Sequence, residues 1–413
     1  MNYQARRDQL MQQLDDNSIC VIFAQHEVKR SADANYPFEV NRNFYYFTGI
    51  DEPSAVLVMT KQNNQIQQQL FIRDIDVKME KWVGTFITQA KATQISGIET
   101  VDFLSNYQHQ LNQWLSQMPS KVYVEHNQLD PDDALTLGQQ LQQKCHTSYP
   151  SVVVENVFSL ITKMRMIKSA DEIEYIKQAI DITNKAFLAV IDSLSEDTKE
   201  NHIQATFEYI LKMNHAKPAF DMIVAGGKRA CVLHYVDNDQ PIAKQELVLT
   251  DMGAQVGYYN ADITRTFTKA KTFTQKQRQY MTIVLEAMDK VIASIKPGVT
   301  IKQLNELVIQ VYQVRLKEIG LISEDHQVSD YYYHGVSHHL GLDTHDISDR
   351  SMPLQAGNVI TVEPGLYIAA ENIGIRIEDD ILVVEDGCVN LSQHVIKTPE
   401  QLEAYLQKKA TTE

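Results

Sequence analysis

One order of elements occurs twice in the second half of this 413-residue chain, and it limits the possible folds more than any other feature. Each time, the spacing predicts two helices, then a histidine, and then two strands that each carry a carboxylate. These residues are His234, Asp251 and Asp262 in the first repeat, and His338, Glu363 and Glu378 in the second. The carboxylates of the second repeat follow their counterparts by 112 and 116 residues. Such similar offsets predict a duplicated α/β unit with a site between its halves.

Local signals place the helices of both halves. A capping box at Ser169–Glu172 opens the first helix, because the serine hydroxyl can accept from the backbone while the glutamate reaches back. Pro297-Gly298 ends the third helix and Thr300 caps the fourth. We therefore expect helices at about residues 170–194, 199–214, 274–296 and 300–320.

The first 150 residues alternate between short β-branched runs and stretches with helical spacing, which is typical of an α/β domain. A polar turn at residues 61–65 joins two of the runs into a hairpin. A change of pattern near residues 155–168 predicts domains at residues 1–160 and 165–405. We expect strands at residues 18–24, 55–60, 69–73 and 121–125, and helices at 104–117 and 133–143.

The composition argues against several classes of function. Asp and Glu number 53 against 38 Lys and Arg, and the net charge of −15 disfavours binding to nucleic acid or an anionic membrane. No apolar run approaches 18 residues, so no transmembrane helix is expected. The first residues are polar, unlike a signal peptide, and the four cysteines are widely separated, which predicts a cytoplasmic protein with reduced thiols. The cysteines are Cys20, Cys145, Cys231 and Cys388.

The two carboxylates of the first half lie eleven residues apart on strands that the sequence makes neighbours. Asp251 ends an apolar strand and Asp262 stands near the start of the next, with glycine turns between them. Buried side by side they would repel each other, and a divalent cation would remove that cost. Taken alone, the pair also fits two turn aspartates or an exposed polar face.

The second half supplies two more carboxylates on strands too apolar to be exposed. Residues 358–365 (NVITVEPG) carry Glu363, and residues 372–380 (NIGIRIEDD) carry Glu378. Isoleucines alternate along the latter strand, so Arg376 and Glu378 share its other face, which we expect to point into an interior or a cleft and not into bulk water. Arg376 fits either a structural ion pair with one of the acids or a role in orienting a metal ligand.

Four of the 13 histidines fall within residues 331–346 (YYYHGVSHHLGLDTHD). Neutral imidazole is both the commonest metal ligand and the usual proton carrier, so the cluster predicts function. The spacing is not HExxH and no cysteine pair accompanies it, which argues against a structural zinc site. Four carboxylates with one histidine form an oxygen-rich set that suits two Mn²⁺-like ions. Two such ions activate water and polarise a carbonyl, as amide hydrolysis near neutral pH requires.

These motifs resemble those of the pita-bread metallopeptidases, the group that includes methionine aminopeptidase, prolidase and aminopeptidase P. The similarity rests on DMGAQVGYYNADITRTF, HGVSHHLGLDTHD, TVEPGLYI and GIRIEDDILV, which follow the family order across roughly residues 165–400. Ser31–Met59 also resembles the N-terminal domain of aminopeptidase P and related prolidases. The resemblance implies an α/β (α+β) chain with an N-terminal α/β domain and a C-terminal pita-bread domain that has an internal pseudo-two-fold duplication.

The resemblance also implies a role for each candidate metal ligand. Asp262 and Glu378 would bridge two metal ions. Asp251 would bind one ion through both oxygens, while His338 and Glu363 would complete the ligands of the other. The ions would be Mn²⁺, with Co²⁺ or Zn²⁺ as alternatives.

Further residues would act around the metals, again by resemblance. His234, His334 and His345 correspond to histidines that contact the substrate or stabilise the tetrahedral intermediate. Tyr367 and Arg376 would support the metal ligands. A bridging hydroxide would attack the peptide carbonyl, with Glu363 as the proton shuttle and His345 as a donor to the oxyanion.

The implied enzyme is an Xaa-Pro aminopeptidase that acts on peptides with proline in second position and forms a dimer or tetramer. Proline makes a tertiary amide without an N–H, so its recognition needs a dedicated pocket. Only 15 residues separate Glu363 from Glu378, as in bacterial Xaa-Pro dipeptidases (prolidases), which remain the alternative. The N-terminal resemblance favours aminopeptidase P. A non-catalytic binding module or a metal-independent creatinase-like hydrolase would not need all five ligands that this sequence retains.

Overall fold

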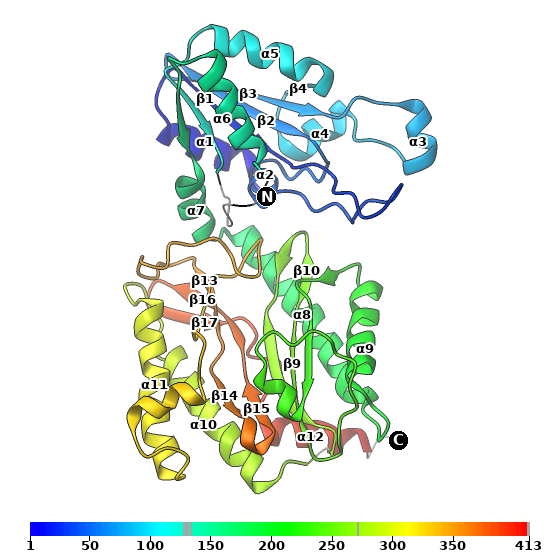
Figure 1. Cartoon of the computed structure of the whole chain (residues 1–413), viewed down its shortest axis with the longest axis vertical. Helices are drawn as coiled ribbons and strands as arrows, with labels where there is room; N and C mark the ends of the chain where they lie inside the picture. The colour runs from blue at the N-terminus through cyan, green and yellow to red at the C-terminus, as the bar shows by residue number, and fades with distance from the viewer. Residues whose placement is uncertain (127–131, 133, 271, 411–413) are drawn as a thin grey trace. The chain divides into compact units, whose positions relative to one another are not determined.

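The computed structural model describes residues 1–126, 132, 134–270 and 272–410. The chain divides into two compact units, residues 1–164 and residues 165–413. Both contain helices and strands, so the mixed α/β fold that the sequence predicts is confirmed (Figure 1).

The first unit is built on one mixed sheet. Its strands are β1 (Ser18–Phe23), β2 (Val56–Gln62), β3 (Gln65–Ile72), β4 (Thr100–Phe103), β5 (Lys121–Val124) and β6 (Val153–Asn156). Its helices are α1 (Tyr3–Gln13), α2 (Arg42–Thr48), α3 (Val77–Val83), α4 (Gln89–Ser96), α5 (Leu104–Ser116), α6 (Leu137–Ser148) and α7 (Phe158–Met166), of which α7 crosses the boundary between the units. The strand order is β4-β3-β2-β1-β5-β6, and side chains of the sheet, α5 and α6 form the core.

The hairpin of the first unit is tighter than the sequence suggests. β2 runs on to Gln62 and β3 already begins at Gln65, so only Asn63 and Asn64 form the turn. Both asparagines have positive φ, of 51° and 59°. Asparagine tolerates this left-handed backbone, and two such residues in sequence match the twist of the flanking strands.

The other expected elements of the first unit are present, with one displaced start. α6 begins at Leu137 behind a capping box formed by Thr136 and Gln139, and it continues to Ser148. The helix was expected from residue 133, which lies outside the described residues. The expected strands near residues 18, 55 and 121 and the helix at 104–117 are confirmed.

The second unit repeats one order of elements, helix pair followed by strands. The first half contains α8 (Ala170–Ser193), α9 (Glu200–Met213), β7 (Lys217–Pro218), β8 (Ile223–Gly226), the 3₁₀ turn η1 (Gly227–Cys231), β9 (Leu247–Met252), β10 (Ala254–Val256), β11 (Tyr259–Asn260) and β12 (Ile263–Thr268). The second half contains α10 (Gln275–Ile292), α11 (Ile301–Glu318), η2 (Asp325–Asp330), β13 (Val359–Val362), β14 (Gly365–Ile368), η3 (Ala369–Glu371), β15 (Ile373–Arg376), β16 (Asp379–Val384), β17 (Gly387–Asn390) and the terminal helix α12 (Pro399–Ala410).

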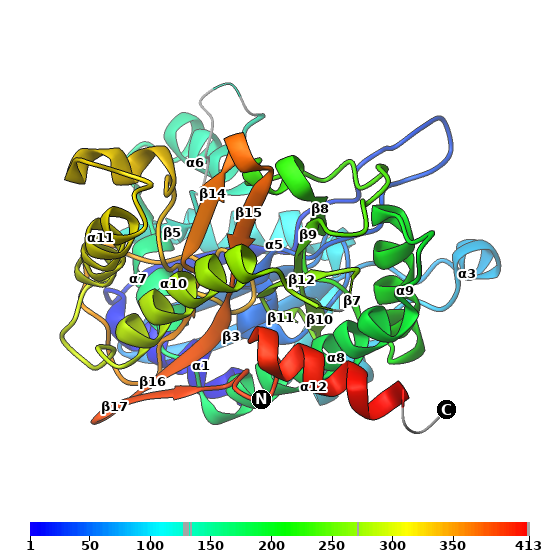
Figure 2. The same ribbon diagram turned by 90° about the horizontal axis from the view of Figure 1, so that it is seen from below.

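All four helices expected in this unit are confirmed, with the predicted caps at Ser169 and Thr300 and a further capping box at Thr274. Helices α8 and α9 lie beside the strands of the first half, and α10 and α11 lie beside those of the second (Figure 1). Seen from below, α10 crosses β14 and β15 (Figure 2). Each helix pair therefore covers the strands of its own half.

The two long strands predicted for the second half are each broken at a carboxylate. Glu363 and Pro364 separate β13 from β14, and Ile377 and Glu378 separate β15 from β16. Proline lacks the N–H that would continue a strand ladder, which explains the first break. Both glutamates therefore lie at strand junctions, where the backbone changes direction and the side chain is free to face the interior.

Hydrogen bonds between the halves bring these junctions beside β12. The Glu378 N–H donates to the Thr264 carbonyl at 3.1 Å. The Thr266 hydroxyl donates to the Arg376 carbonyl at 2.9 Å, and the Asp262 N–H donates to the Asp380 carboxylate at 3.2 Å. This contact between strands far apart in sequence sets the geometry of the candidate site.

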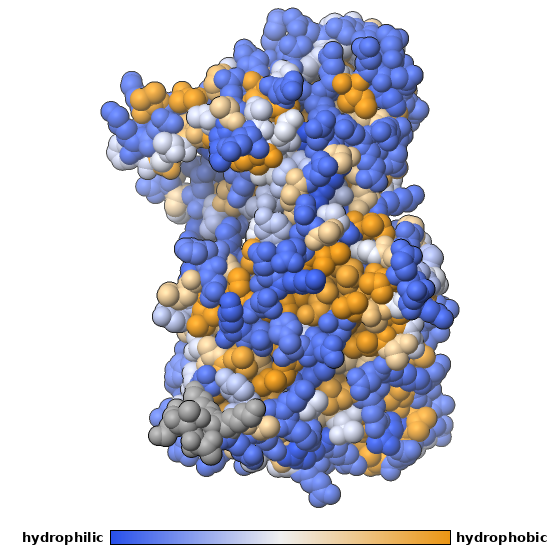
Figure 3. Space-filling model, turned by 180° about the vertical axis from the view of Figure 1, so that it is seen from behind, coloured by the Kyte–Doolittle hydropathy of each residue, from blue (hydrophilic) through white to orange (hydrophobic). Residues whose placement is uncertain are grey.

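The molecular surface is largely hydrophilic on the face shown in Figure 3, with apolar residues gathered in patches between the polar ones. Among the described helices, none combines the length and the apolar character that crossing a bilayer demands.

Candidate metal centre

A pocket of about 200 Å³ in the second unit gathers most of the candidate residues. It is lined by Leu233, His234, Asp251, Asp262, His334, Gly335, Ser337, His338, His345, Arg350, Glu363, Arg376 and Glu378. All five candidate ligands and all three candidate histidines are therefore in one place. Tyr367 lies behind this lining and contacts it through hydrogen bonds.

The acids reach the pocket from strand junctions and from one strand end. Asp262 stands in the link between β11 and β12, just as Glu363 and Glu378 stand in the links of the second half. Asp251 lies near the end of β9, directly opposite Thr264 in the antiparallel register. Thr264 joins the two halves, because its hydroxyl donates a hydrogen bond to the Glu378 carboxylate of the second half at 2.6 Å.

Three side chains approach one another closely enough to share one cation. One ligand atom from each of Asp262, His338 and Glu378 lies within 4.8 Å of the other two. His338 Nε2 is 3.3 Å from an Asp262 oxygen and 3.6 Å from a Glu363 oxygen. His338 Nδ1 lies 3.0 Å from the His339 carbonyl, a contact that directs Nε2 toward the acids.

The electrostatics of the cluster fit a bound cation. Burial, and then the surrounding carboxylates, raise the pKa of Asp262 and of Glu378 well above their ordinary values. Burial also raises the pKa of Glu363, although His338 and Arg376 oppose the shift. Asp251 Oδ1 is buried and accepts no hydrogen bond from any described residue. Such a concentration of buried acids is stable as carboxylates only beside positive charge, and the donors are of the kind that divalent metals bind.

The guanidinium of Arg376 supplies a fixed positive charge at the site. Arg376 is 4% exposed, and its Nη2 donates to Asp251 at 2.7 Å. Its other nitrogens donate to the Tyr367 hydroxyl at 3.1 Å and to the Thr264 hydroxyl at 3.2 Å. The alternation predicted from the isoleucines is confirmed, since Arg376 and Glu378 face the pocket while Ile375 and Ile377 are buried.

His334 is held by this network and stays neutral. The Tyr367 hydroxyl lies 2.8 Å from His334 Nε2, and His334 Nδ1 lies 2.8 Å from the Gly335 carbonyl. Burial, and then the Arg376 guanidinium, lower the pKa of His334 to about 4. A neutral ring between a hydroxyl and a carbonyl is fixed in orientation and can exchange a proton only at a defined nitrogen.

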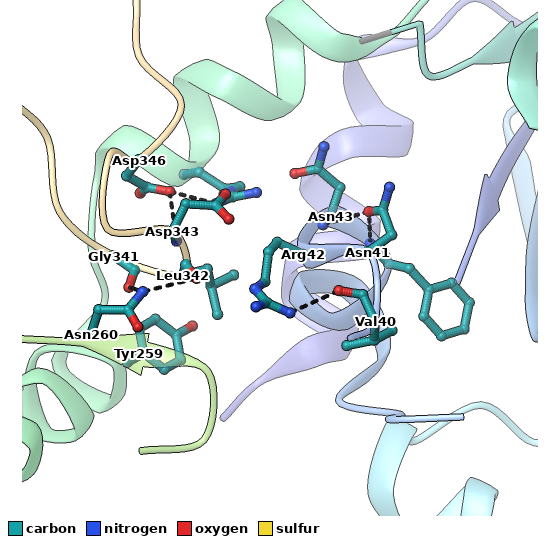
Figure 4. A network of polar contacts seen from close by, with 12 residues as sticks. Val40, Asn41, Arg42, Asn43, Tyr259, Asn260, Gly341, Leu342, Asp343 and Asp346 are labelled. Carbon is teal, nitrogen blue, oxygen red and sulfur yellow. Dashed lines mark hydrogen bonds and ion pairs between the residues drawn. The ribbon is translucent and has the colours of Figure 1, made fainter. Parts of the chain in front are cut away.

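His345 stands on a loop that several polar contacts hold. Asn260 donates to the carbonyls of Gly341 and Leu342, both at 3.1 Å (Figure 4). Asp346, the residue after His345, is buried and accepts from Arg165 and, at 2.9 Å, from Lys168. The His345 ring packs 4.2 Å from that of His338, measured between centroids.

The environment of His345 also keeps it neutral. Partial desolvation, and then the neighbouring rings of His338 and His234, lower its pKa to about 4. His345 therefore reaches the pocket as an uncharged imidazole next to a candidate ligand, which suits a hydrogen-bond donor to a developing negative charge.

Several residues that line the pocket or hydrogen-bond to its lining were not predicted from the sequence. Thr264 shares the period-two alternation with Asp262 along DITRTF, so that pattern contained a signal for it. Thr361 contacts Glu363 at 3.5 Å and lies two residues before it, which is a similar signal. Arg350 and Ser337 stand in irregular segments, where the sequence offers no periodicity to indicate direction.

Comparison with known proteins identifies the family of this chain. Residues 174–385 match metallopeptidase family M24, and residues 3–123 match the N-terminal domain of aminopeptidase P. The Xaa-Pro aminopeptidase of Escherichia coli (strain K12) is 33% identical over 428 residues, which cover 98% of this chain and 97% of that protein. The structure of E. coli aminopeptidase P with the inhibitor Pro-Leu is 33% identical, with a TM-score of 0.91 over 99% of this chain and 98% of that one.

A second group of relatives matches a shorter part of the chain. The Xaa-Pro dipeptidase of Pyrococcus furiosus is 38% identical over 244 residues, which cover 58% of this chain and 66% of that protein. Both groups are peptidases. This chain therefore belongs to metallopeptidase family M24 and is a metal-dependent aminopeptidase.

Proposed function

We propose that the protein hydrolyses the Xaa-Pro peptide bond and releases the N-terminal residue of peptides that have proline in second position. The observation that carries the proposal is the buried cluster of Asp262, His338 and Glu378, inside a chain that resembles Xaa-Pro aminopeptidases over its whole length. Catalysis belongs to residues 165–405, and residues 1–160 form the N-terminal domain of that enzyme class.

The ligands that we propose for two divalent cations are Asp251, Asp262, His338, Glu363 and Glu378. The unpaired Asp251 oxygen and the raised pKa values of Asp262 and Glu378 support this set. Four carboxylates and one imidazole favour Mn²⁺, with Co²⁺ and Zn²⁺ as alternatives. When bound, such cations lower the pKa of water and polarise the scissile carbonyl.

The remaining steps belong to side chains of the pocket. Glu363 takes a proton from the attacking water at a carboxylate oxygen and passes it to the leaving proline nitrogen. His345, neutral at pH 7, donates a hydrogen bond to the oxyanion. His234 and His334 contact the substrate, and Tyr367 fixes the ring of His334.

His345→Ala is expected to lower kcat about a hundredfold or more, because it removes one donor to the oxyanion. Metal content should stay near that of the unchanged protein, as measured by elemental analysis of the dialysed enzyme. His394→Ala, which alters an exposed histidine paired with Asp181, is the control and should retain full activity. Loss of metal in His345→Ala would instead make His345 a ligand.

Arg376→Lys is expected to lower kcat/KM about 10- to 100-fold, the usual cost of disturbing a partner of a metal ligand. Lysine keeps the charge but cannot reproduce the planar fork that reaches Asp251, Tyr367 and Thr264 together. Arg278→Lys, in a half-buried ion pair of α10 with Glu400 and Glu403, tests the same replacement away from the pocket. Steady-state kinetics of both variants tests this. A kcat/KM of Arg376→Lys equal to that of the unchanged protein would contradict a role of Arg376 in the mechanism.

An aminopeptidase is favoured over a dipeptidase by the coverage of the relatives. The aminopeptidase match includes residues 3–123, whereas the dipeptidase match covers little more than half of the chain. A dipeptidase must bind the free carboxylate of proline, while an aminopeptidase must leave space for a continuing peptide.

The decisive experiment loads the metal-stripped protein with Mn²⁺ and offers Xaa-Pro-Xaa, Xaa-Pro and Xaa-Ala-Xaa peptides together. Release of the first residue from the Xaa-Pro tripeptide alone, or from it fastest, supports the proposal. Cleavage of only the dipeptide would make the protein a prolidase. The absence of any cleavage, with metal bound, would indicate a binding module and contradict the proposal.

A further inference from the structure

The loop that carries His234 contains no strand, and although its first part, η1, packs against β15, the turn with His234 follows that contact. It leaves β8 at Gly226, passes through η1, and returns to β9 at Leu247. His234 lines the metal pocket from a turn of this loop that is exposed to solvent. Some other contact must hold the loop if the imidazole is to meet a substrate reproducibly.

Glu200 provides such a contact from the first turn of α9. Its side chain is fully buried, with 0% exposed. One carboxylate oxygen accepts from the Gly226 N–H at 2.8 Å and from Arg229 Nε at 2.7 Å. The other accepts from the Tyr235 hydroxyl at 2.9 Å and from the Gln240 N–H at 3.0 Å. One carboxylate therefore joins Gly226, before the histidine, to Gln240, after it, and another of its donors is the residue next to His234.

A second contact from the same helix acts in parallel. Asn238, 2% exposed, donates to Gln204 at 3.0 Å and to the Met222 carbonyl at 2.7 Å, and it accepts from the Val224 N–H at 2.8 Å. Gln204 lies one helical turn beyond Glu200, so both side chains face the loop from the same side of α9. The segment with His234 is thus fixed before and after the histidine.

We propose that Glu200 is a positioning residue for catalysis, which holds the loop of residues 226–240 so that His234 faces the substrate pocket. The proposal rests on the function proposed above for His234. Glu200 itself does not line the pocket. Its effect on the reaction therefore passes through the placement of His234.

The chemistry requires a carboxylate at this position. Four donors meet two oxygens, and an isosteric glutamine would turn an NH₂ group toward two of those donors. Burial, and then the Glu200 carboxylate, raise the pKa of Tyr235 to about 12, so its hydroxyl remains a donor at neutral pH. Glu200→Gln should loosen the loop without removing any group from the pocket.

The test is a double-mutant cycle between Glu200→Gln and His234→Ala in the Mn²⁺-loaded enzyme, with an Xaa-Pro tripeptide as substrate. Misplacing a reacting group by about 1 Å can cost about a hundredfold, so Glu200→Gln should lower kcat/KM about 10- to 100-fold. In the His234→Ala background the same change should cost less than about twofold, since coupled residues are non-additive. Metal content should be unchanged in all variants.

Two further variants keep the result interpretable if Glu200→Gln folds poorly. Tyr235→Phe removes one of the four donors and is expected to lower kcat/KM about fivefold, the equivalent of one hydrogen bond of about 1 kcal/mol. Glu196→Gln, at an exposed ion pair with Lys244, is the control and should leave kcat/KM unchanged.

The outcomes separate this inference from the proposed function. Equal losses from Glu200→Gln with and without His234 would overturn it, because a general structural defect does not depend on that ring. Unchanged kinetics in both Glu200→Gln and Tyr235→Phe would overturn it as well. An inactive parent enzyme would contradict the proposed function first, and an active His234→Ala variant would contradict only the role of that histidine and the inference built on it.

Discussion

Asp262→Ala is expected to lower turnover of an Xaa-Pro tripeptide about a thousandfold or more and to reduce the bound metal. Asp262 is the acid that lies 3.3 Å from His338, and one of its oxygens groups with ligand atoms of His338 and Glu378, so it stands at the centre of the proposed ligand set. Cations in such a site stabilise the transition state by several kcal/mol, and about 4 kcal/mol corresponds to about a thousandfold in rate. Kinetics and elemental analysis of one preparation provide both readouts.

Two companion variants make this result specific. Asp262→Asn keeps the shape and removes the charge, so it should lose metal and activity almost as completely as alanine. Asp386→Ala changes an exposed aspartate in the turn between β16 and β17 and should leave both unchanged. Full activity of Asp262→Ala with two metals bound would remove Asp262 from the ligand set.

Much of this fold could be predicted because its helices carry local signals. The caps at Ser169, Thr274 and Thr300 each use a side chain three residues away, so a short window of sequence contains the whole interaction. The alternation of isoleucines around Arg376 is equally local. It correctly predicted that Arg376 and Glu378 would share a face directed inward.

The features that could not be predicted depend on contacts between distant strands. Thr264 lies opposite Asp251 and donates to Glu378, which is 114 residues away. No periodicity within either segment specifies that pairing. The break at Ile377 and Glu378 has the same origin, because the strand ends where β12 of the other half supplies the hydrogen bonds instead.

The position of Glu200 shows a further limit of sequence patterns. A glutamate in the first turn of a helix is usually explained by the helix dipole, and Glu200 fits that explanation. Its four donors lie 26 to 40 residues further along the chain. Only the folded structure shows that these donors converge on one buried carboxylate.

Metal removal is expected to lower the melting temperature, and by more at pH 7.5 than at pH 5.5. A ligand at about a thousand times its Kd stabilises a protein by about 4 kcal/mol, which for a unit of this size is about 10 °C. Without metal, burial raises the pKa values of Asp262, Glu378 and Glu363, and neighbouring carboxylates raise them as well.

The direction of the pH effect follows from proton binding. Between about pH 4, where unfolded carboxyls titrate, and the raised pKa values of the folded state, the folded metal-free protein binds more protons than the unfolded chain. Its free energy of unfolding therefore falls as pH rises through this window. Cations displace those protons and restore the lost stability, so the difference in melting temperature should widen toward neutral pH. Thermal unfolding of the loaded and stripped protein across this range measures it. Asp262→Asn has one titrating group fewer, so the melting temperature of the metal-free variant should change less with pH. A difference in melting temperature between loaded and stripped protein that is constant with pH would contradict an acidic metal centre.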